Sequence, residues 1–385
     1  MKILIAPDSF KESLDAVGVA QAIQEGVKAV LNDAETILLP IADGGEGTVA
    51  ALVSSGRGKY ADTWVQGPLG DPVSARWGVL PDNTAVIEMA AASGLPLIPK
   101  ELRNPLLAST YGTGQLIKAA LDRGCSRIIL GLGGSATNDG GAGALSALGA
   151  RLLDARGREI SANAQGLLEL DSIDLSVVDP RLAEVRVDIA CDVTNPLLGP
   201  QGASRIFGPQ KGADPDMVEE LERALARLAQ VARRDLDRDI AGFPGSGAAG
   251  GLAAGLSLVA DIKLRPGIEL VLETMDFAAH LEGADLVFTA EGRIDSQSAM
   301  GKAISGIARL SHAAGVPVIA LCGTLGRGYQ EVYKEGVTAV LPIIDAPMSL
   351  EQAMAETARL LSAASSRALR LLLTPVGCQG KGKGI

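Results

Sequence analysis

Three apolar runs of the sequence read as short buried strands, and each is followed at once by charged or polar residues: KILIA, ETILLPIA and DLVFTA. A buried strand does not need a carboxylate, a hydroxyl and an ammonium group at its tip for its own stability. In an open parallel sheet, ligands bind outside the carboxyl ends of the strands, at the point where the strand order reverses. We therefore expect a ligand site built from these strand ends: Asp8, Ser9 and Lys11; Asp43, Gly45 and Glu46; and Glu291, Arg293 and Asp295.

Two further strand ends lie in the middle of the chain, where GLGGSATNDGGAG follows RIIL and CDVTNPLLG follows VDIA. A glycine loop can turn backbone amides toward a phosphate at the start of the next helix, whose dipole adds a partial positive charge. Because Mg²⁺ prefers oxygen ligands and keeps part of its hydration shell, Asp139 and Asp192 are candidates to hold it. The residues expected at the phosphate are Gly133, Gly134, Ser135, Thr137 and Asn138.

Each of these signals also has a purely structural explanation. Acids at strand ends are often helix N-caps, which applies to Asp15 and Asp43. Glycine-rich segments often only allow close packing, both at 140–143 and at the GxxxG spacing between 247 and 255. Five polar strand ends in one chain are nevertheless hard to explain by capping alone, so we favour a ligand site.

The segment GLGGSA at 131–136 also fits the dinucleotide-binding pattern G-x-G-x-x-G/A, with Asp154 about twenty residues further on. The polar TND that follows suits a phosphate and a metal better than the apolar helix start of an NAD site. A P-loop is excluded near Lys302, because Ser296 stands where its first glycine should be and Ala303 where its Ser or Thr should be.

The elements that must position these residues alternate between strand and helix at both ends of the chain. Helices are predicted at 13–31 and about 46–53 near the N-terminus, and at 302–314 and from the capping box at Ser349 near the C-terminus. Between these ends, 59–94 alternates short β-rich runs with the turns GPLGDP and LPDN, which indicates antiparallel hairpins. Helices at 112–121, about 139–148 and 214–236 complete the middle region.

The predicted fold class is α/β: a Rossmann-like parallel sheet domain, discontinuous in sequence, with a second inserted α/β domain that contains antiparallel strands. We place the first domain at 1–60 and 265–385 and the inserted domain at 61–264, and we expect the active site in the cleft between them. The tail beyond Leu373, TPVGCQGKGKGI, reads as disordered.

The composition of the chain disfavours several classes of binding partner and of enzyme. A net charge of -10 argues against nucleic acid and anionic membrane surfaces, which both reward a basic face. Four cysteines without CxxC spacing read as reduced thiols, and only two histidines are present, which disfavours a His-ligated zinc site or a Ser/His/Asp hydrolase. The longest uncharged apolar stretch, 247–260, is shorter than the ~18 residues that span a bilayer. We expect a soluble cytoplasmic protein with small-molecule partners, either a monomer or a homodimer.

A series of motifs, in order along nearly the whole chain, resembles the glycerate kinase family of bacterial glycerate utilisation, the type unrelated to P-loop kinases: APDSFKESL, ADGGEGT, VIEMAAASGL, STYGTGQLI, GLGGSATNDGGAG, CDVTNPL, FGPQKGA, PGSGAAGGLAAGL and EGRIDSQSAMGK. Glu12 departs from the small residue expected in the first motif, and the tail lies outside the pattern. The resemblance implies phosphorylation of D-glycerate by ATP, with Mg²⁺, to 2-phosphoglycerate or 3-phosphoglycerate with release of ADP.

A kinase must neutralise the triphosphate, hold the metal, bind the carboxylate of the acceptor and orient its hydroxyl. We assign these roles to four groups of residues: catalysis to Asp8, Lys11, Asp192 and Glu291; substrate binding to Ser9, Arg293, Asp295 and Lys211; ATP phosphate binding to Gly45, Gly133, Gly134, Ser135, Thr137, Asn138 and Lys302; and metal binding to Asp43, Glu46 and Asp139.

Two other functions remain open at this point. One is a dinucleotide-dependent oxidoreductase that uses the GLGGSA loop, and the other is a non-catalytic protein that binds a sugar acid. Release of ADP in the presence of D-glycerate excludes the binding protein, and absence of nicotinamide binding excludes the oxidoreductase.

Overall fold

The computed structural model describes residues 1–56 and 58–374, which form two compact units. The first unit joins Met1–Ile41 to Asp276–Ile385, and the second is Ala42–Met275. The predicted disordered tail falls almost entirely outside the described residues, as does Cys378, whereas Cys125, Cys191 and Cys322 are free thiols.

The first unit contains a sheet of five parallel strands in the order β13-β12-β11-β1-β2. Ile3 of β1 pairs with Leu286 of β11 on one side and with Thr36 of β2 on the other. The chain therefore builds outward from β1 to β2 in one direction and from β11 through β12 to β13 in the other. The strand order reverses between β1 and β11, which makes their carboxyl ends the expected ligand position. The bounds are β1 Lys2–Ile5, β2 Glu35–Leu38, β11 Leu286–Ile294, β12 Val318–Leu325 and β13 Ala339–Pro342.

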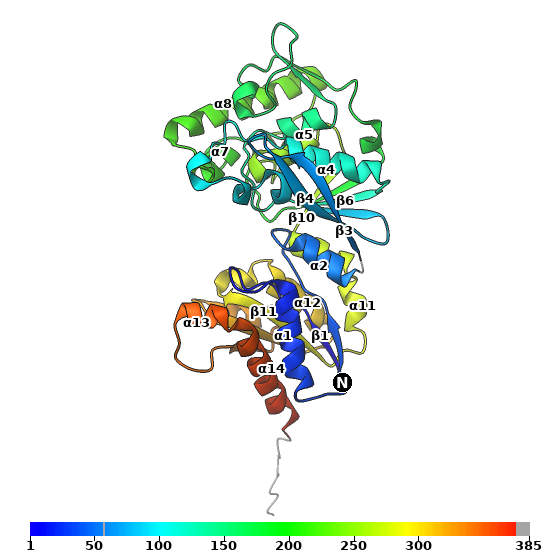
Figure 1. Cartoon of the computed structure of the whole chain (residues 1–385), viewed down its shortest axis with the longest axis vertical. Helices are drawn as coiled ribbons and strands as arrows, with labels where there is room; N and C mark the ends of the chain where they lie inside the picture. The colour runs from blue at the N-terminus through cyan, green and yellow to red at the C-terminus, as the bar shows by residue number, and fades with distance from the viewer. Residues whose placement is uncertain (57, 375–385) are drawn as a thin grey trace, which may run out of the picture. The chain divides into compact units, whose positions relative to one another are not determined.

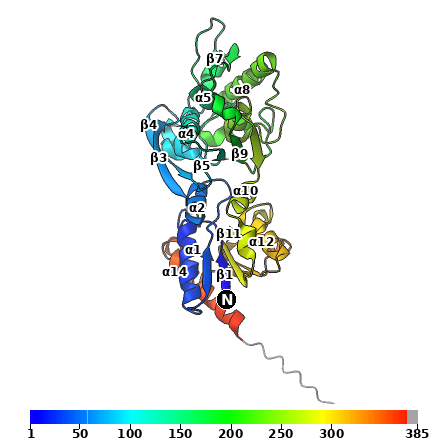
Figure 2. The same ribbon diagram turned by 90° about the vertical axis from the view of Figure 1, so that its right-hand side faces the viewer.

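Helices cover both faces of this sheet, with α1 and α14 on one face and α12 on the other (Figures 1 and 2). Asp15 caps α1 by accepting from the amide of Gly18 at 2.7 Å. A Cβ on Gly26 of α1 would lie 2.1 Å from the carbonyl oxygen of Ser362 in α14, so the close approach of these helices requires glycine there. The helices of this unit are α1 Ala16–Lys28, α11 Phe277–Leu281, α12 Ala303–Ala313, α13 Leu350–Ala355 and α14 Thr357–Leu373, with the 3₁₀ turns η6 Ser296–Ala299 and η7 Tyr329–Tyr333.

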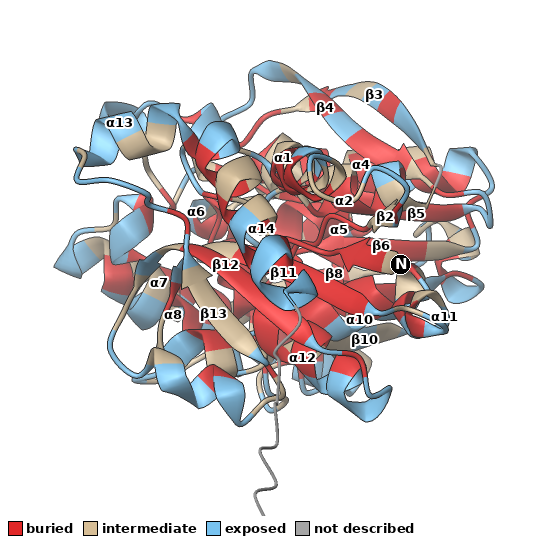
Figure 3. Cartoon of the chain, turned by 90° about the horizontal axis from the view of Figure 1, so that it is seen from below, coloured by how far each residue is buried: buried red, intermediate tan, exposed pale blue. Residues whose placement is uncertain are grey.

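The alternation of the strands between these two layers follows from their sequences. Ile319 and Leu321 of β12 face the α1 and α14 layer, whereas Ala320 and Cys322 face α12. Both faces are therefore buried, which explains why the strand reads as a continuous apolar run. Figure 3 shows β11 and β12 buried and the edge strand β13 only partly so.

The second unit contains a mixed sheet of six strands in the order β10-β9-β6-β5-β4-β3. The hairpins between β3, β4 and β5 are antiparallel, and the remaining pairs are parallel, so the prediction of a mixed α/β fold with antiparallel strands in the middle region is confirmed. A separate antiparallel pair, β7 with β8, was not predicted. The bounds are β3 Lys59–Gln66, β4 Pro72–Val79, β5 Thr84–Glu88, β6 Arg127–Gly131, β7 Arg151–Leu153, β8 Ser172–Asp174, β9 Arg186–Ala190 and β10 Ile262–Arg265.

The longest helix of the second unit, α8, begins as its sequence predicts. The carboxylate of Asp214 accepts from the amide of Met217 at 2.8 Å, and Pro215 occupies the first turn. Its apolar face packs with α5, α6 and α9. The helices are α2 Thr48–Ser55, α3 Ala90–Ser93, α4 Tyr111–Asp122, α5 Ala142–Ala147, α6 Ala164–Leu167, α7 Ala203–Phe207, α8 Pro215–Leu236, α9 Leu252–Leu256 and α10 Gly267–Thr274, with the 3₁₀ turns η1 Leu95–Leu97, η2 Lys100–Leu102, η3 Pro180–Ala183, η4 Pro209–Lys211 and η5 Ala248–Gly250.

The compact units divide the chain at other residues than the expected boundaries. We expected α2 in the first domain, but it packs against β4 and β5 of the second unit. Val53 of α2 approaches Gly78 of β4 so closely that a Cβ there would lie 2.5 Å from it. The first division therefore falls after Ile41, and the second falls after α10.

Two sequence motifs have the structural roles that their residues suggest: a helix cap and close helix packing. The capping box at Ser349 is present, with reciprocal bonds between Ser349 and Gln352. The GxxxG segment packs closely on the glycine loop, because a Cβ on Gly255 would lie 2.3 Å from the carbonyl oxygen of Gly140. Across residues 1–56 and 58–374, every helix is too short or too polar to cross a membrane.

Candidate functional site

The carboxyl ends of β1 and β11 bring together several predicted site residues in the first unit. The amide of Asp8 donates to the carbonyl of Ala290 at 2.8 Å, so the two strands stay paired up to this point. The carboxylate of Asp8 accepts from the amide of Ser9 at 2.6 Å, which turns the chain out of the strand. Asp8 and Ser9 are half-buried and Lys11 is exposed.

The residues after Ala290 form the other side of this cluster. Glu291 accepts a hydrogen bond from the hydroxyl of Ser298 at 2.9 Å. Asp295 caps η6 by accepting from the amide of Gln297 at 2.9 Å, and it also accepts from Nε of Arg293 at 3.1 Å. The Gln297 amide lowers the pKa of Asp295, with smaller contributions from Arg293 and from Lys302 at the start of α12.

We call these residues the strand-end set: Asp8, Ser9, Lys11, Glu291, Arg293, Asp295 and Lys302. It combines cations with carboxylates that hydrogen bonds hold in place, at the position where the strand order of the sheet reverses. Such a set can pair with an anionic group and orient a hydroxyl beside a carboxylate.

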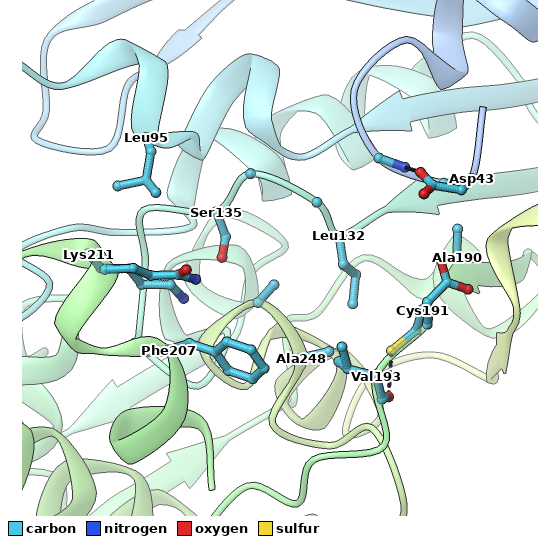
Figure 4. A pocket seen from close by; sticks show the side chains of 17 residues that line it. Asp43, Leu95, Leu132, Ser135, Ala190, Cys191, Val193, Phe207, Lys211 and Ala248 are labelled. Atoms are coloured by element: carbon cyan, nitrogen blue, oxygen red, sulfur yellow. Dashed lines mark hydrogen bonds between the residues drawn. The ribbon is translucent and has the colours of Figure 1, made fainter. Parts of the chain in front are cut away.

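The second unit contains a cavity of about 420 Å³ at the carboxyl ends of β6 and β9, which we call the glycine-loop cavity (Figure 4). This volume lies within the range typical of ligand pockets. The predicted residues that line it are Asp43, Gly45, Gly133, Gly134, Ser135, Asp192 and Lys211. Its other lining residues are Gly44, Leu95, Leu132, Ala190, Cys191, Val193, Phe207, Gln210, Ala248 and Ala249.

Close backbone approach forms one wall of this cavity. A Cβ on Gly133 would lie 2.8 Å from Cα of Gly45, and a Cβ on Gly131 would lie 2.5 Å from the carbonyl oxygen of Gly44. The loop that precedes α2 therefore rests directly on the loop that follows β6. This contact holds Asp43 at the cavity.

Asp43 and Asp192 lie on neighbouring segments of the cavity wall. The carboxylate of Asp192 accepts from the amide of Gly267 at 2.9 Å. A Cβ on Gly267 would lie 1.8 Å from the carbonyl oxygen of Asp43. Gly267, at the start of α10, thus contacts both segments and keeps the two acids at the same cavity.

Lys211 is almost fully buried, with 2% of its surface exposed. Its Nζ donates to the carbonyl of Thr137 at 2.6 Å and therefore ties η4 to the glycine loop. Burial lowers the pKa of Lys211 to about 7, although Asp139 partly offsets this effect. Lys211 therefore loses its proton much more readily than an exposed lysine does.

Asp139, which we expected to hold Mg²⁺, has a different role in the structure. It is fully buried, and its carboxylate accepts from the amide and hydroxyl of Thr110, both at 2.8 Å, and from the amides of Gly141 and Gly143, both at 3.1 Å. These bonds use its oxygens to join the start of α4 to the start of α5. The positive end of α5, which we expected to attract a phosphate, is therefore occupied by a side chain of the protein.

Three other predicted residues do not line the cavity. Thr137 and Asn138 are fully buried, and Asn138 donates to the hydroxyl of Ser204 at 3.0 Å. Glu46 is exposed on the loop before α2. The carboxylate of Glu88, from β5, caps the first turn of α2 by accepting a hydrogen bond from the amide of Val49 at 2.7 Å. Burial raises the pKa of Glu88.

Asp154, the acid of the dinucleotide-binding pattern, also lies outside the cavity lining. Its carboxylate accepts from the amides of Arg156 and Arg158 and pairs with the guanidinium of Arg158 at 2.7 Å. It therefore stabilises the turn after β7, and the hydrogen bonds lower the pKa of Asp154 to about 2.

Sequence reasoning missed the apolar residues of the cavity and the capping role of Glu88. The motifs of the resemblance contain these apolar residues, since Phe207 lies in FGPQKGA, Leu95 in VIEMAAASGL and Ala248 in PGSGAAGGLAAGL. Apolar side chains carry no chemical signature in a sequence, so only the order of the motifs pointed to them.

The comparisons with known proteins agree with this picture. The model of the glycerate kinase family matches residues 3–373. The chain is 50% identical to the glycerate kinase of Halalkalibacterium halodurans over 364 residues, which cover 94% of this chain and 96% of the relative. It is 48% identical to the glycerate 2-kinase of Escherichia coli strain K12 over 354 residues, which cover 92% and 93% of the two chains.

A solved structure is similar over the same length. The crystal structure of a protein assigned as glycerate kinase 2 from Salmonella typhimurium LT2 superposes with a TM-score of 0.88 at 46% identity and covers 97% of this chain and 98% of the other. The resemblance inferred from the motifs and the prediction of a kinase are thereby confirmed. The chain belongs to the glycerate kinase family.

Proposed function

We propose that the protein transfers the γ-phosphate of ATP to the 2-hydroxyl of D-glycerate, with 2-phosphoglycerate and ADP as products. The observation that carries this proposal is the similarity over more than nine-tenths of the chain to relatives named glycerate kinase, one of them a glycerate 2-kinase. The geometry supports it, because each unit provides one set of polar groups suited to one part of the reaction.

The strand-end set acts on the acceptor in this proposal. Lys11 and Arg293 pair with the carboxylate of glycerate, and the hydroxyl of Ser9 hydrogen-bonds to the substrate. Asp8 and Glu291 are the two carboxylates that can accept the proton of the attacking hydroxyl, and their bonds to Ser9 and Ser298 hold them in orientation. General base catalysis of this kind contributes ~10²- to 10⁴-fold to a rate.

Asp43 and Asp192 are the residues that would hold Mg²⁺. Two carboxylates at a cavity suit this ion, which proteins usually bind through one or two carboxylates together with water and substrate phosphates. Within residues 1–56 and 58–374 no cluster of three or more His, Cys, Asp or Glu side chains is placed to hold a metal, so the site does not resemble a closed protein cage. When bound, the ion supplies neutralisation of the phosphate charge during transfer.

A coupled assay of ADP release tests the proposed function. We expect D-glycerate to support turnover in the presence of MgATP, and we expect hexoses and nucleosides to support far less. A control with NAD in place of ATP should show no oxidation of D-glycerate. Equal turnover with hexoses, or no ADP release with D-glycerate, would contradict the proposal.

A further inference from the structure

Part of the wall of the glycine-loop cavity is apolar. Figure 4 shows Leu95 and Phe207 on one side of the cavity, with Ser135 and Lys211 between them, and Leu132 and Ala248 nearer to Cys191. Glycerate is a three-carbon hydroxy acid that carries oxygen on every carbon, so contact with this wall would remove water from its polar groups without replacing the lost hydrogen bonds. A purine has two apolar faces and gains from the same contact. The wall therefore favours a ligand with a flat ring.

Two carboxylates lie on the other side of the cavity. Asp43 lies near Ala190 and away from Leu95 and Phe207 (Figure 4), and Asp192 lies two residues after the end of β9. The loop after β6 lines the cavity with glycine backbone at Gly133 and Gly134, and the hydroxyl of Ser135 lies beside Leu95 and Lys211. A ligand with an apolar ring at one end and a metal-binding anionic chain at the other fits both sides of this cavity.

The strand-end set of the first unit has the opposite character. Its side chains are charged or hydroxylic, and Lys11 and Arg293 are exposed. Arg293 pairs with Asp295, and Ser298 donates to Glu291, so the cluster consists of cations beside oriented carboxylates. Such a cluster suits a small hydroxylated anion.

We propose that the glycine-loop cavity of the second unit binds the nucleotide, with the base against Leu95 and Phe207 and the phosphates toward Asp43 and Asp192, and that the strand-end set of the first unit binds glycerate. This division of ligands between the units rests on the proposed function for the identity of the two ligands.

Nucleotide binding without glycerate tests the proposal, measured by titration calorimetry with MgATP. Phe207→Ala removes the aromatic wall, and Ala248→Leu fills part of the cavity. We expect each to raise the Kd for MgATP by at least about tenfold, since burying one large apolar side chain against a ligand is worth that much. Ile206→Ala is the matched control, because Ile206 precedes Phe207 in α7, is 41% exposed and does not line the cavity. Its Kd should equal that of the wild type.

A second pair of measurements tests the other half of the proposal. Arg293→Met should leave the Kd for MgATP within about twofold and raise the KM for D-glycerate by at least about tenfold, as loss of one charged contact predicts. Hydrogen exchange of the wild-type protein with and without MgATP gives a test that does not depend on the folding of any variant. MgATP should protect the amides of 131–135 and 207–211, and protection confined to 8–14 and 291–302 would overturn the assignment.

The outcomes separate this proposal from the proposed function. If Phe207→Ala and Ala248→Leu bind MgATP as tightly as the wild type while D-glycerate is phosphorylated, the division of ligands is wrong and the function stands. If both variants lose MgATP affinity while the wild type releases no ADP with D-glycerate, the nucleotide site stands and the function is wrong.

Discussion

Lys211 offers a quantitative test of the glycine-loop cavity, because burial lowers its pKa from 10.5 to about 7. The folded protein therefore releases this proton at lower pH than the unfolded chain does. Stability must rise with pH through the window between the two pKa values, since the unfolded chain holds one more proton there. Loss of the buried charge of Lys211 then adds about 2 kcal/mol of stability between about pH 7 and about pH 9.

Lys211→Met removes this titration and the hydrogen bond to Thr137. The lost bond costs about 1 kcal/mol at any pH. The variant should nevertheless gain stability relative to the wild type as the pH falls toward 7, because it no longer buries a charge. The stability of the variant should therefore change less between pH 7 and 9 than that of the wild type, by about 2 kcal/mol.

Urea unfolding followed by tryptophan fluorescence measures this difference in the right part of the chain. The sequence contains two tryptophans, Trp64 and Trp77, and both lie in the second unit with Lys211. The pKa of the Cys125 thiol is also raised by burial, but its contribution cancels when the variant is subtracted from the wild type. Lys263→Met, an exposed lysine of the same unit, is the control and should keep the wild-type pH dependence. The same pH dependence in Lys211→Met and in the wild type would refute a buried, weakly basic Lys211.

Three further predictions follow from the same structure. Asp8→Asn and Lys11→Met should keep the melting temperature within a few degrees and lower kcat/KM for D-glycerate by at least ~100-fold; near-normal turnover in both would move the catalytic role to Glu291. Asp139→Asn should lower the stability of the second unit by about 2 kcal/mol, because an amide NH₂ then replaces an oxygen that accepts hydrogen bonds from buried donors. Urea unfolding followed by tryptophan fluorescence measures this loss. An unchanged stability would restore Asp139 as a candidate metal ligand. Burial raises the pKa of Glu88, so the folded protein keeps this proton to a higher pH than the unfolded chain does. The wild type should therefore lose stability as the pH rises above about 4.5, and Glu88→Gln should not show this loss. Urea unfolding of both proteins between pH 4 and 7 measures the difference, and parallel curves of stability against pH would count against it.

The fold followed largely from local sequence signals. Asp214 and Pro215 begin α8 and Ser349 begins α13, because a cap needs only residues within one turn of the helix. The central strands β1, β11 and β12 of the first unit were recognisable as continuous apolar runs, since they are buried between two layers of helices. Strand β10 was missed, because IKLR is short and alternates charged with apolar residues.

Features that depend on distant parts of the chain were less predictable. Helix α2 begins only seven residues after Ile41, yet its contacts with β4 and β5 assign it to the second unit. An acid that follows a strand can bind a metal or cap a helix, and the choice depends on which helix starts the fold brings near it. Asp139 and Glu88 both serve helix starts that lie far from them in sequence, at Thr110 and Val49.

The residues of the candidate site also fall into those that the sequence could indicate and those that depend on the fold. The structure brings Asp8, Glu291 and Arg293 to one edge of the sheet, as expected for polar residues at the carboxyl ends of parallel strands, and that edge is where the strand order reverses. The assignment of Thr137 and Asn138 to the phosphate failed to anticipate their burial, since a polar loop gives no indication of which residues face inward.

Phosphorus NMR of the reaction mixture tests the central claim most directly. With wild-type protein, D-glycerate and MgATP, we predict that ADP and one new phosphomonoester accumulate in equal amounts. The phosphorus of 2-phosphoglycerate couples to the single proton on carbon 2 and should appear as a doublet. A triplet would identify 3-phosphoglycerate and contradict the proposed position of transfer, and ADP with inorganic phosphate alone would contradict phosphorylation of glycerate itself.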